Sequence, residues 1–210
     1  MTTKMMTTLF ATAALGIAGC TTAMNDDMDA GVQTGAQSGA RTNSSAPTAS
    51  RSVRVGGQPM YANRTISANA VNAPNLSQLV SLVQRAGLVE TLSGPGPFTV
   101  FAPNNDAFTR VPAETMGRLS DNAVLTRALT YHVVPGRMTR ADIVAAIRTG
   151  GGTARFTTVN GNPLTARMQG RNVVLEGNNS SIAYIQTRDV PASNGIVHVI
   201  NGVLIPPSLG

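Results

Sequence analysis

The stretch Phe98–Phe108, with the sequence FTVFAPNNDAF, decides how this chain is expected to fold. Its first four residues, Phe98–Phe101, are β-formers with little polar content, which predicts a strand buried on both faces. Pro103 ends that strand and steers the chain into the pair Asn104-Asn105, where a helix can be capped. Asp106 in the first turn favours the helix dipole. The stretch therefore predicts a buried strand that runs directly into a helix.

Helical patterns flank this strand on both sides. Upstream, apolar residues recur at helical spacing from Leu76 to Val83, with Asn75 as the expected cap and Gly87 as the expected stop. Downstream, one helix is expected to begin at Asp121 and end near Tyr131-His132. Another is expected to begin with a capping box formed by Thr139 and Asp142.

The period changes to that of strands after Gly150–Gly152. Further strands are predicted at Val173–Leu175, Ile182–Ile185 and Ile196–Ile200. The pair Asn201-Gly202 reads as a tight turn, so the last segment is expected to be a hairpin with Val203 and Ile205 on strand faces. Because helices come first and strands later, the fold class is α+β with an antiparallel sheet.

The amino-terminus has the pattern of an export signal. Residues 1–19 combine Lys4 with a short apolar run, Leu9–Ala18, which is shorter than the roughly 20 residues of a membrane-spanning helix. The run ends at Ile17–Cys20, which resembles the bacterial lipobox, and Cys20 is the single cysteine of the chain. The resemblance implies a lipid such as palmitate on the Cys20 thiol. An ordinary secretory signal with an incidental cysteine is the alternative.

The next segment has the composition of a tether. Residues 20–54 are mainly small and polar and cannot bury enough apolar surface to fold, so we expect a flexible, disordered tether followed by one domain over residues 55–210. In lipoprotein sorting, an aspartate after the lipidated cysteine retains the protein in the inner membrane. Thr21 occupies that position, which favours the outer membrane and a domain facing the periplasm or the cell surface.

Three motifs together resemble the fasciclin domain family. FTVFAPNNDAF at Phe98–Phe108 is similar to the first family signature, YHVVPG at Tyr131–Gly136 resembles the central tyrosine-histidine motif, and NGIVHVINGVLIP at Asn194–Pro206 resembles the second signature. They occur in the family's order, and the resemblance covers the chain from about Val55 to Pro206. It implies a wedge-shaped β-sheet unit with packed helices and a role in adhesion or extracellular interaction.

The resemblance also suggests a site and partners. In this family the tyrosine-histidine region is implicated in adhesive contacts, which places Tyr131, His132 and the turn of Val133, Val134, Pro135 and Gly136 near a partner. The partner is expected to be an envelope polysaccharide, a matrix component or another protein. The competing interpretation, which we favour, is that Tyr131 and His132 stabilise the fold.

The sequence gives little support to other chemistry. No GxSxG or zinc-ligand spacing occurs, and the aspartates at helix starts are explained by capping, so no enzymatic activity, metal or cofactor is expected. The alternative function is a carrier or stress lipoprotein that binds a metal, haem or lipid through Tyr131 and His132. The 16 basic and 10 acidic residues give a net charge of +6, but the arginines are scattered, so no nucleic-acid partner is expected.

Overall fold

A computed structural model of the chain describes residues 52–178 and 181–207. The predicted signal at residues 1–19, the lipidated Cys20 and the tether up to residue 51 lie outside these ranges. Within them, no helix has the length and apolarity needed to cross a membrane.

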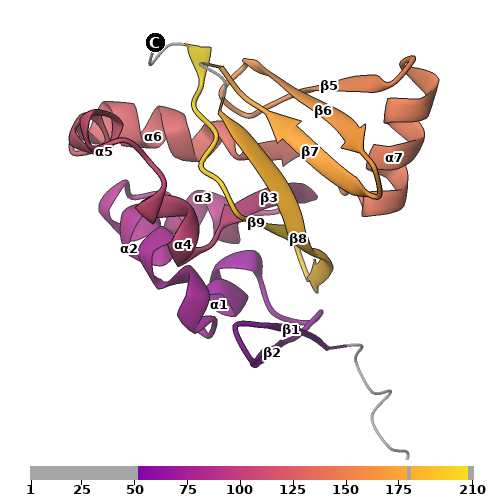
Figure 1. Ribbon diagram of the computed structural model, residues 1–210. Coiled ribbons are helices and arrows are strands. Elements are labelled where there is room, and N and C mark those ends of the chain that lie inside the picture. The colour runs from indigo at the N-terminus through magenta and orange to yellow at the C-terminus, as the bar shows by residue number, and fades with distance from the viewer. Residues whose placement is uncertain (1–51, 179–180, 208–210) are drawn as a thin grey trace, which may run out of the picture. The chain divides into compact units, whose positions relative to one another are not determined.

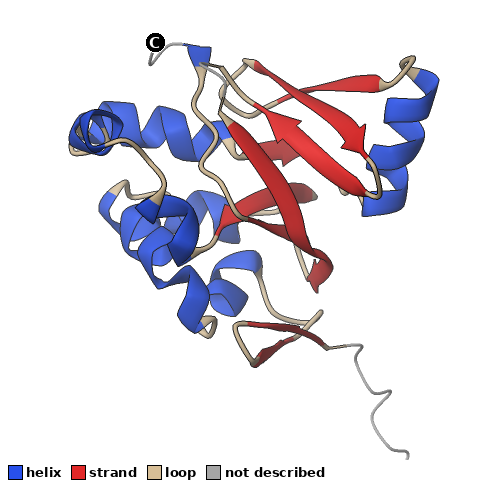
Figure 2. Ribbon diagram, viewed as in Figure 1, coloured by secondary structure: helices blue, strands red, loops and turns tan. Residues whose placement is uncertain are grey.

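The helices occupy most of the first half of the described chain and are joined by short connections. Their bounds are α1 (Ile66–Val71), the 3-10 turn η1 (Pro74–Leu76), α2 (Ser77–Arg85), α3 (Val89–Ser93), α4 (Asn105–Thr109), α5 (Ala113–Arg118), α6 (Asn122–Tyr131) and α7 (Arg140–Thr149). Figure 2 shows that most of these helices gather on one side of the strands.

The strands form a small ribbon and one large sheet. Their bounds are β1 (Val53–Val55), β2 (Gln58–Met60), β3 (Phe98–Pro103), β4 (Val133–Pro135), β5 (Thr153–Thr157), β6 (Pro163–Gln169), β7 (Asn172–Glu176), β8 (Ile182–Ala192) and β9 (Gly195–Ile200). β1 and β2 pair with each other. The last residue of β1, Val55, is where the sequence places the start of the domain.

The large sheet has the order β4-β3-β9-β8-β7-β6-β5. Every neighbouring pair is antiparallel except β3 and β9, which run parallel from Phe98 opposite Gly195 to Pro103 opposite Ile200. The long strand β8 pairs with β7 through its first residues and with β9 through the rest, and the pairing with β9 contains two register shifts. The α+β class is thus confirmed, with one parallel pair that the sequence did not predict.

The parallel strands β3 and β9 separate two apolar cores. Val100 and Val197 point into the first core, which α1 to α6 cover, whereas Phe101 and Ile200 point into the second, which is built from α7 and β5 to β8. In Figure 1, α7 lies beside β5 and β6 while the other helices lie toward β3 and β9. Both faces of β3 are therefore buried, as its composition predicts.

Local capping signals formed as expected. The Asn104 side chain accepts from the backbone N–H of Ala107 at the start of α4, and Asp121 accepts from two N–H groups at the start of α6. Thr139 and Asp142 form the capping box of α7. Gly87 follows α2 with a φ of 68°, a left-handed conformation that suits glycine at a helix end.

Two local predictions were wrong. Asn75 lies within η1 rather than capping α2, and its side-chain oxygen is buried without a hydrogen-bond partner. The terminal hairpin around Asn201-Gly202 does not form, because β9 ends at Ile200 and Val203–Ile205 is not a strand. The Asn201 side chain accepts instead from the backbone N–H of Tyr184, which ties the turn to β8 rather than to a new strand.

Candidate functional site

The Tyr131–Gly136 segment joins α6 to β4 and lies at the boundary between the two cores. Tyr131 is the last residue of α6, His132 is its C-cap, and Val133–Pro135 forms β4, antiparallel to β3. The first four side chains are at most 7 % exposed. The exposed surface of the segment is therefore provided by Pro135 and, in part, Gly136.

The Tyr131 ring packs in the second core and is 1 % exposed. Its hydroxyl donates to the backbone oxygen of Pro163 at 2.9 Å, which links the end of α6 to the start of β6. Burial raises the pKa of the Tyr131 hydroxyl, so this group stays protonated and keeps its donor role at neutral pH.

His132 is buried, and backbone groups engage both of its ring nitrogens. The N–H of Leu204 donates to Nε2 at 2.9 Å, which places the ring proton on Nδ1. Nδ1 in turn lies 2.7 Å from the carbonyl oxygen of Ala128, to which it donates. Burial lowers the pKa of His132 to about 4, although the bond to Ala128 opposes that shift. The ring is therefore neutral and joins α6 to the chain after β9.

The second histidine, His198, has a similar environment. Its ring stacks on Phe101 with centroids 5.7 Å apart, Nδ1 accepts from the N–H of Asp189 at 3.2 Å, and Nε2 donates to the carbonyl of Met138 at 2.9 Å. Burial lowers the pKa of His198, while the contacts with Met138 and Asp189 act in the opposite direction. This ring positions the turn before α7 against β9.

These contacts bear on the alternative of a metal or haem at Tyr131 and His132. An imidazole ligates a metal through an unprotonated nitrogen, and in His132 that nitrogen already accepts from the Leu204 N–H. Ligation there requires breaking a buried hydrogen bond. In the described part of the chain, moreover, no group of three or more His, Asp and Glu side chains lies close enough to hold a metal ion.

The rest of the segment holds the sheet edge in place. Val133 faces the first core and Val134 the second. The N–H of Gly136 donates to the carbonyl of Pro97 at 2.9 Å, and its carbonyl accepts from the Thr99 hydroxyl at 2.7 Å. Whether Pro135 and Gly136 also contact a partner stays a prediction.

Sequence reasoning missed two polar residues that organise this region. The fully buried Thr99 hydroxyl donates to Gly136 and accepts from the N–H of Met138, so it fixes the turn after β4. Asn194, in the β8–β9 turn, accepts from the N–H of Ile66 and donates to the carbonyls of Leu92 and Gly94. No local pattern reveals these roles, because the partners are up to 128 residues away.

A separate exposed surface lies on the outer face of β5 to β8, opposite α7. Here the register aligns Thr153, Arg167, Val174 and Tyr184 in one row across four strands. Arg167 pairs with Glu176, and the Tyr184 hydroxyl donates to Gln169 at 2.7 Å. No side chain of this face was singled out from the sequence, since the register that aligns them is set by the folded sheet.

Comparison with known proteins places the fold and the motifs in a family. Residues 74–206 match the family model of the Fasciclin domain. The chain belongs to the fasciclin domain family. It is similar to Protein sll1483 of Synechocystis sp., with 39% identity over 68% of this chain and 74% of that protein. It is also similar to the immunogenic protein MPB70 of Mycobacterium bovis, with 34% identity over 68% of this chain and 69% of that protein.

The solved structures agree on the fold. A FAS1 domain pair from the insect cell adhesion molecule Fasciclin I superposes with a TM-score of 0.60 at 17% identity, covering 70% of this chain and 52% of that one. This chain thus spans about half of that structure. Fasciclin domain proteins are typically non-enzymatic adhesion or extracellular proteins.

Proposed function

We propose that this fasciclin protein is a lipid-anchored, non-enzymatic interaction protein of the bacterial cell envelope. The anchor is a lipid on Cys20, residues 20–54 tether the domain, and the favoured location is the outer membrane, with the domain facing the periplasm or the cell surface. The partner is an envelope polysaccharide, with a matrix component or another protein as the other outcomes of the test.

The observation that carries the proposal is the outer face of β5 to β8. Arg155 and Gln169 are exposed there, and Arg167 and Tyr184 are partly exposed, while the central Val174 is 0 % exposed. Guanidinium, phenol and amide groups can hydrogen-bond to sugar hydroxyls, and a tyrosine ring adds an apolar surface. A sheet face with this composition suits an extended polymer.

An excess of positive charge, +6 over the whole chain, supports contact with anionic polymers. All of the chain's arginines except Arg41 and Arg51 lie in the described residues. Because surface charges act mainly on association and are screened by salt, they assist binding without giving it specificity. Binding that depends on Tyr184 as well as on charge would therefore distinguish specific recognition from simple attraction.

The test is binding of the purified full chain to isolated envelope polysaccharides and intact cells at low and high salt. We expect saturable binding that survives high salt and weakens about tenfold or more when Arg155→Ser and Tyr184→Ala are combined. Arg148→Ser is the matched control, since Arg148 is an exposed arginine on α7, which covers the opposite face. Binding that vanishes with salt, or that the double variant retains, overturns the assignment to this face.

The anchor needs a test of its own. Cys20→Ser is expected to prevent lipid attachment and to move the protein from the membrane fraction to the soluble fraction. Metabolic labelling with palmitate and separation of inner from outer membranes measure both effects. Unchanged membrane association of Cys20→Ser, without palmitate label on the native chain, contradicts the anchor.

A further inference from the structure

The first core contains an apolar cavity that the proposed interaction does not use. Its volume is about 100 Å³, and it lies between the sheet and the helices α1, α2 and α3. No Asp, Glu, Lys or Arg side chain lines it. Apolar cavities of this order stay dry and take up apolar molecules.

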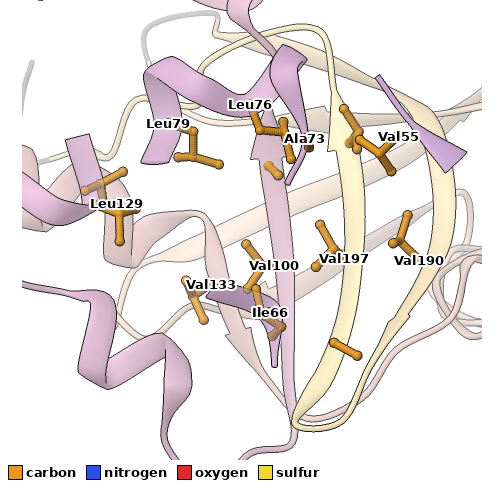
Figure 3. Packing of buried hydrophobic residues seen from close by; sticks show 14 of the residues in the cluster. Val55, Ile66, Ala73, Leu76, Leu79, Val100, Leu129, Val133, Val190 and Val197 are labelled. Atoms are coloured by element: carbon orange, nitrogen blue, oxygen red, sulfur yellow. The ribbon is translucent and has the colours of Figure 1, made fainter. Parts of the chain in front are cut away.

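The floor of the cavity contains a row of four valines. Val133, Val100, Val197 and Val190 lie opposite one another in register on β4, β3, β9 and β8, and all four line the cavity. Figure 3 shows these side chains side by side across the strands. Because neighbouring strands are about 4.8 Å apart, the row is about 14 Å long. The floor is therefore elongated and apolar, and Phe98 and Phe101 of β3 also line the cavity.

Several of the exposed hydrophobic side chains of the domain line the mouth of this cavity. Large hydrophobic side chains are notably exposed at five places in the described residues, and three of them line this cavity: Val71 at 64 %, Val89 at 37 % and Val159 at 45 %. Val159 also continues the floor, since its N–H donates to the carbonyl of Val133 at 2.8 Å. Exposed apolar residues around an apolar cavity are a feature of ligand-binding sites.

The polar groups around the cavity are neutral. Ser67, Gln84 and Thr91 line it beside the exposed valines, and they can hydrogen-bond to a carboxyl group. The buried His132 also lines it, but its ring nitrogens are engaged by Ala128 and Leu204. The ligand that fits is thus a single apolar chain with one small polar end.

We propose that this cavity binds the acyl chain of a free fatty acid. The last few carbons of the chain enter the cavity beside the valine row under α1 to α3, the following part contacts the exposed valines of the mouth, and the carboxyl group remains near the solvent. Because a dry cavity of about 150 Å³ holds one benzene ring, a volume of about 100 Å³ takes about four carbon atoms of one acyl chain and gives no place to a second chain or a charged headgroup.

The experiment is a fluorescence titration of the purified, delipidated full chain with cis-parinaric acid, followed by displacement with palmitic acid. We expect saturable binding to one site and full displacement. The Ala70→Leu variant adds carbon atoms to the roof of the cavity from α1, where Ala70 is only partly buried. It should bind at least tenfold more weakly while its thermal midpoint is unchanged or raised, because the added atoms fill empty space.

A matched pair of surface variants tests the mouth. Val159 and Ile182 are 45 % and 44 % exposed, but Ile182 does not line the cavity. Val159→Asp should weaken parinaric acid binding about tenfold, whereas Ile182→Asp should leave it unchanged. The proposal is overturned if the folded native chain shows no saturable binding or if folded Ala70→Leu binds like the native chain. The proposal is also overturned if the protein takes up lipid from phosphatidylglycerol vesicles but does not bind free fatty acid.

Discussion

The backbone N–H of Leu204 donates a hydrogen bond of 2.9 Å to Nε2 of His132, a residue 72 positions earlier in the chain. This bond joins the central motif to the end of the second signature. Both groups are buried, so water cannot replace either partner when the other is removed. The two motifs of the family resemblance are thus parts of one packed unit.

The first prediction follows from that bond. His132→Ala leaves the Leu204 N–H and the Ala128 carbonyl without their partner and creates a cavity, so we expect a loss of about 3 kcal/mol in the free energy of unfolding. Urea denaturation measures it. Pro135→Ala, in the same segment but exposed, is the control and should change stability little. Equal thermal midpoints for His132→Ala and the native chain, with partner binding lost, would show that His132 serves binding instead.

The second prediction concerns pH. His132 has a pKa of about 4 in the folded chain and an ordinary value of about 6.5 in the unfolded chain, and the pKa of His198 is also lowered. Below pH 6.5 the unfolded chain binds protons that the folded chain does not. Stability is therefore full above pH 6.5 and falls toward pH 4, by about 1.4 kcal/mol per pH unit for His132 alone.

Urea titrations across that pH range measure this dependence. The His132→Gln variant should show a shallower slope, even if it is less stable throughout, because one of the two buried groups no longer titrates. A free energy of unfolding that does not change between neutral pH and pH 5 contradicts the buried, neutral state of these rings.

The third prediction concerns Asn194, which holds α1 and α3 against the β8–β9 turn. Asn194→Ala removes an acceptor for the Ile66 N–H and the donor for Leu92 and Gly94, with an expected loss of about 2–3 kcal/mol. Hydrogen exchange should accelerate most over residues 66–93. Asn72→Ala is the comparison, since its side chain bonds only to Ala68 within α1. Uniform acceleration across the domain would contradict this local role.

The fourth prediction compares two glycines. A Cβ at Gly195 would lie 2.1 Å from the carbonyl oxygen of Phe98, so Gly195→Ala must push β9 away from β3 and should cost about 4 kcal/mol or more. Gly170, in the β6–β7 turn, has a φ of 59° and open space around it, so Gly170→Ala should cost only about 1 kcal/mol of backbone strain. Soluble yield and urea midpoints measure both. Similar losses for the two variants would mean that close strand approach at Gly195 is unimportant.

Helix caps formed where the residues involved lie close together in the sequence. Asn104, Asp121 and the Thr139–Asp142 pair were placed correctly at helix starts, because a cap is made by groups three or four residues apart. Asn75 and Asn201-Gly202 have equally good local chemistry but did not act as predicted. At Asn201, the side chain accepts a hydrogen bond from the distant backbone N–H of Tyr184, which a local hairpin would not use.

By itself, the sequence determined the α+β class, the buried character of Phe98–Phe101, most of the helix boundaries and membership of the family, because these depend on local propensity and on ordered motifs. Only the tertiary structure decided that β3 runs parallel to β9, that His132 bonds to Leu204, and that four valines from four strands form one row beneath α1 to α3. Each of these depends on how segments far apart in the sequence meet in the folded chain. Register is set by how the whole sheet packs between its two cores, and no local pattern contains that information.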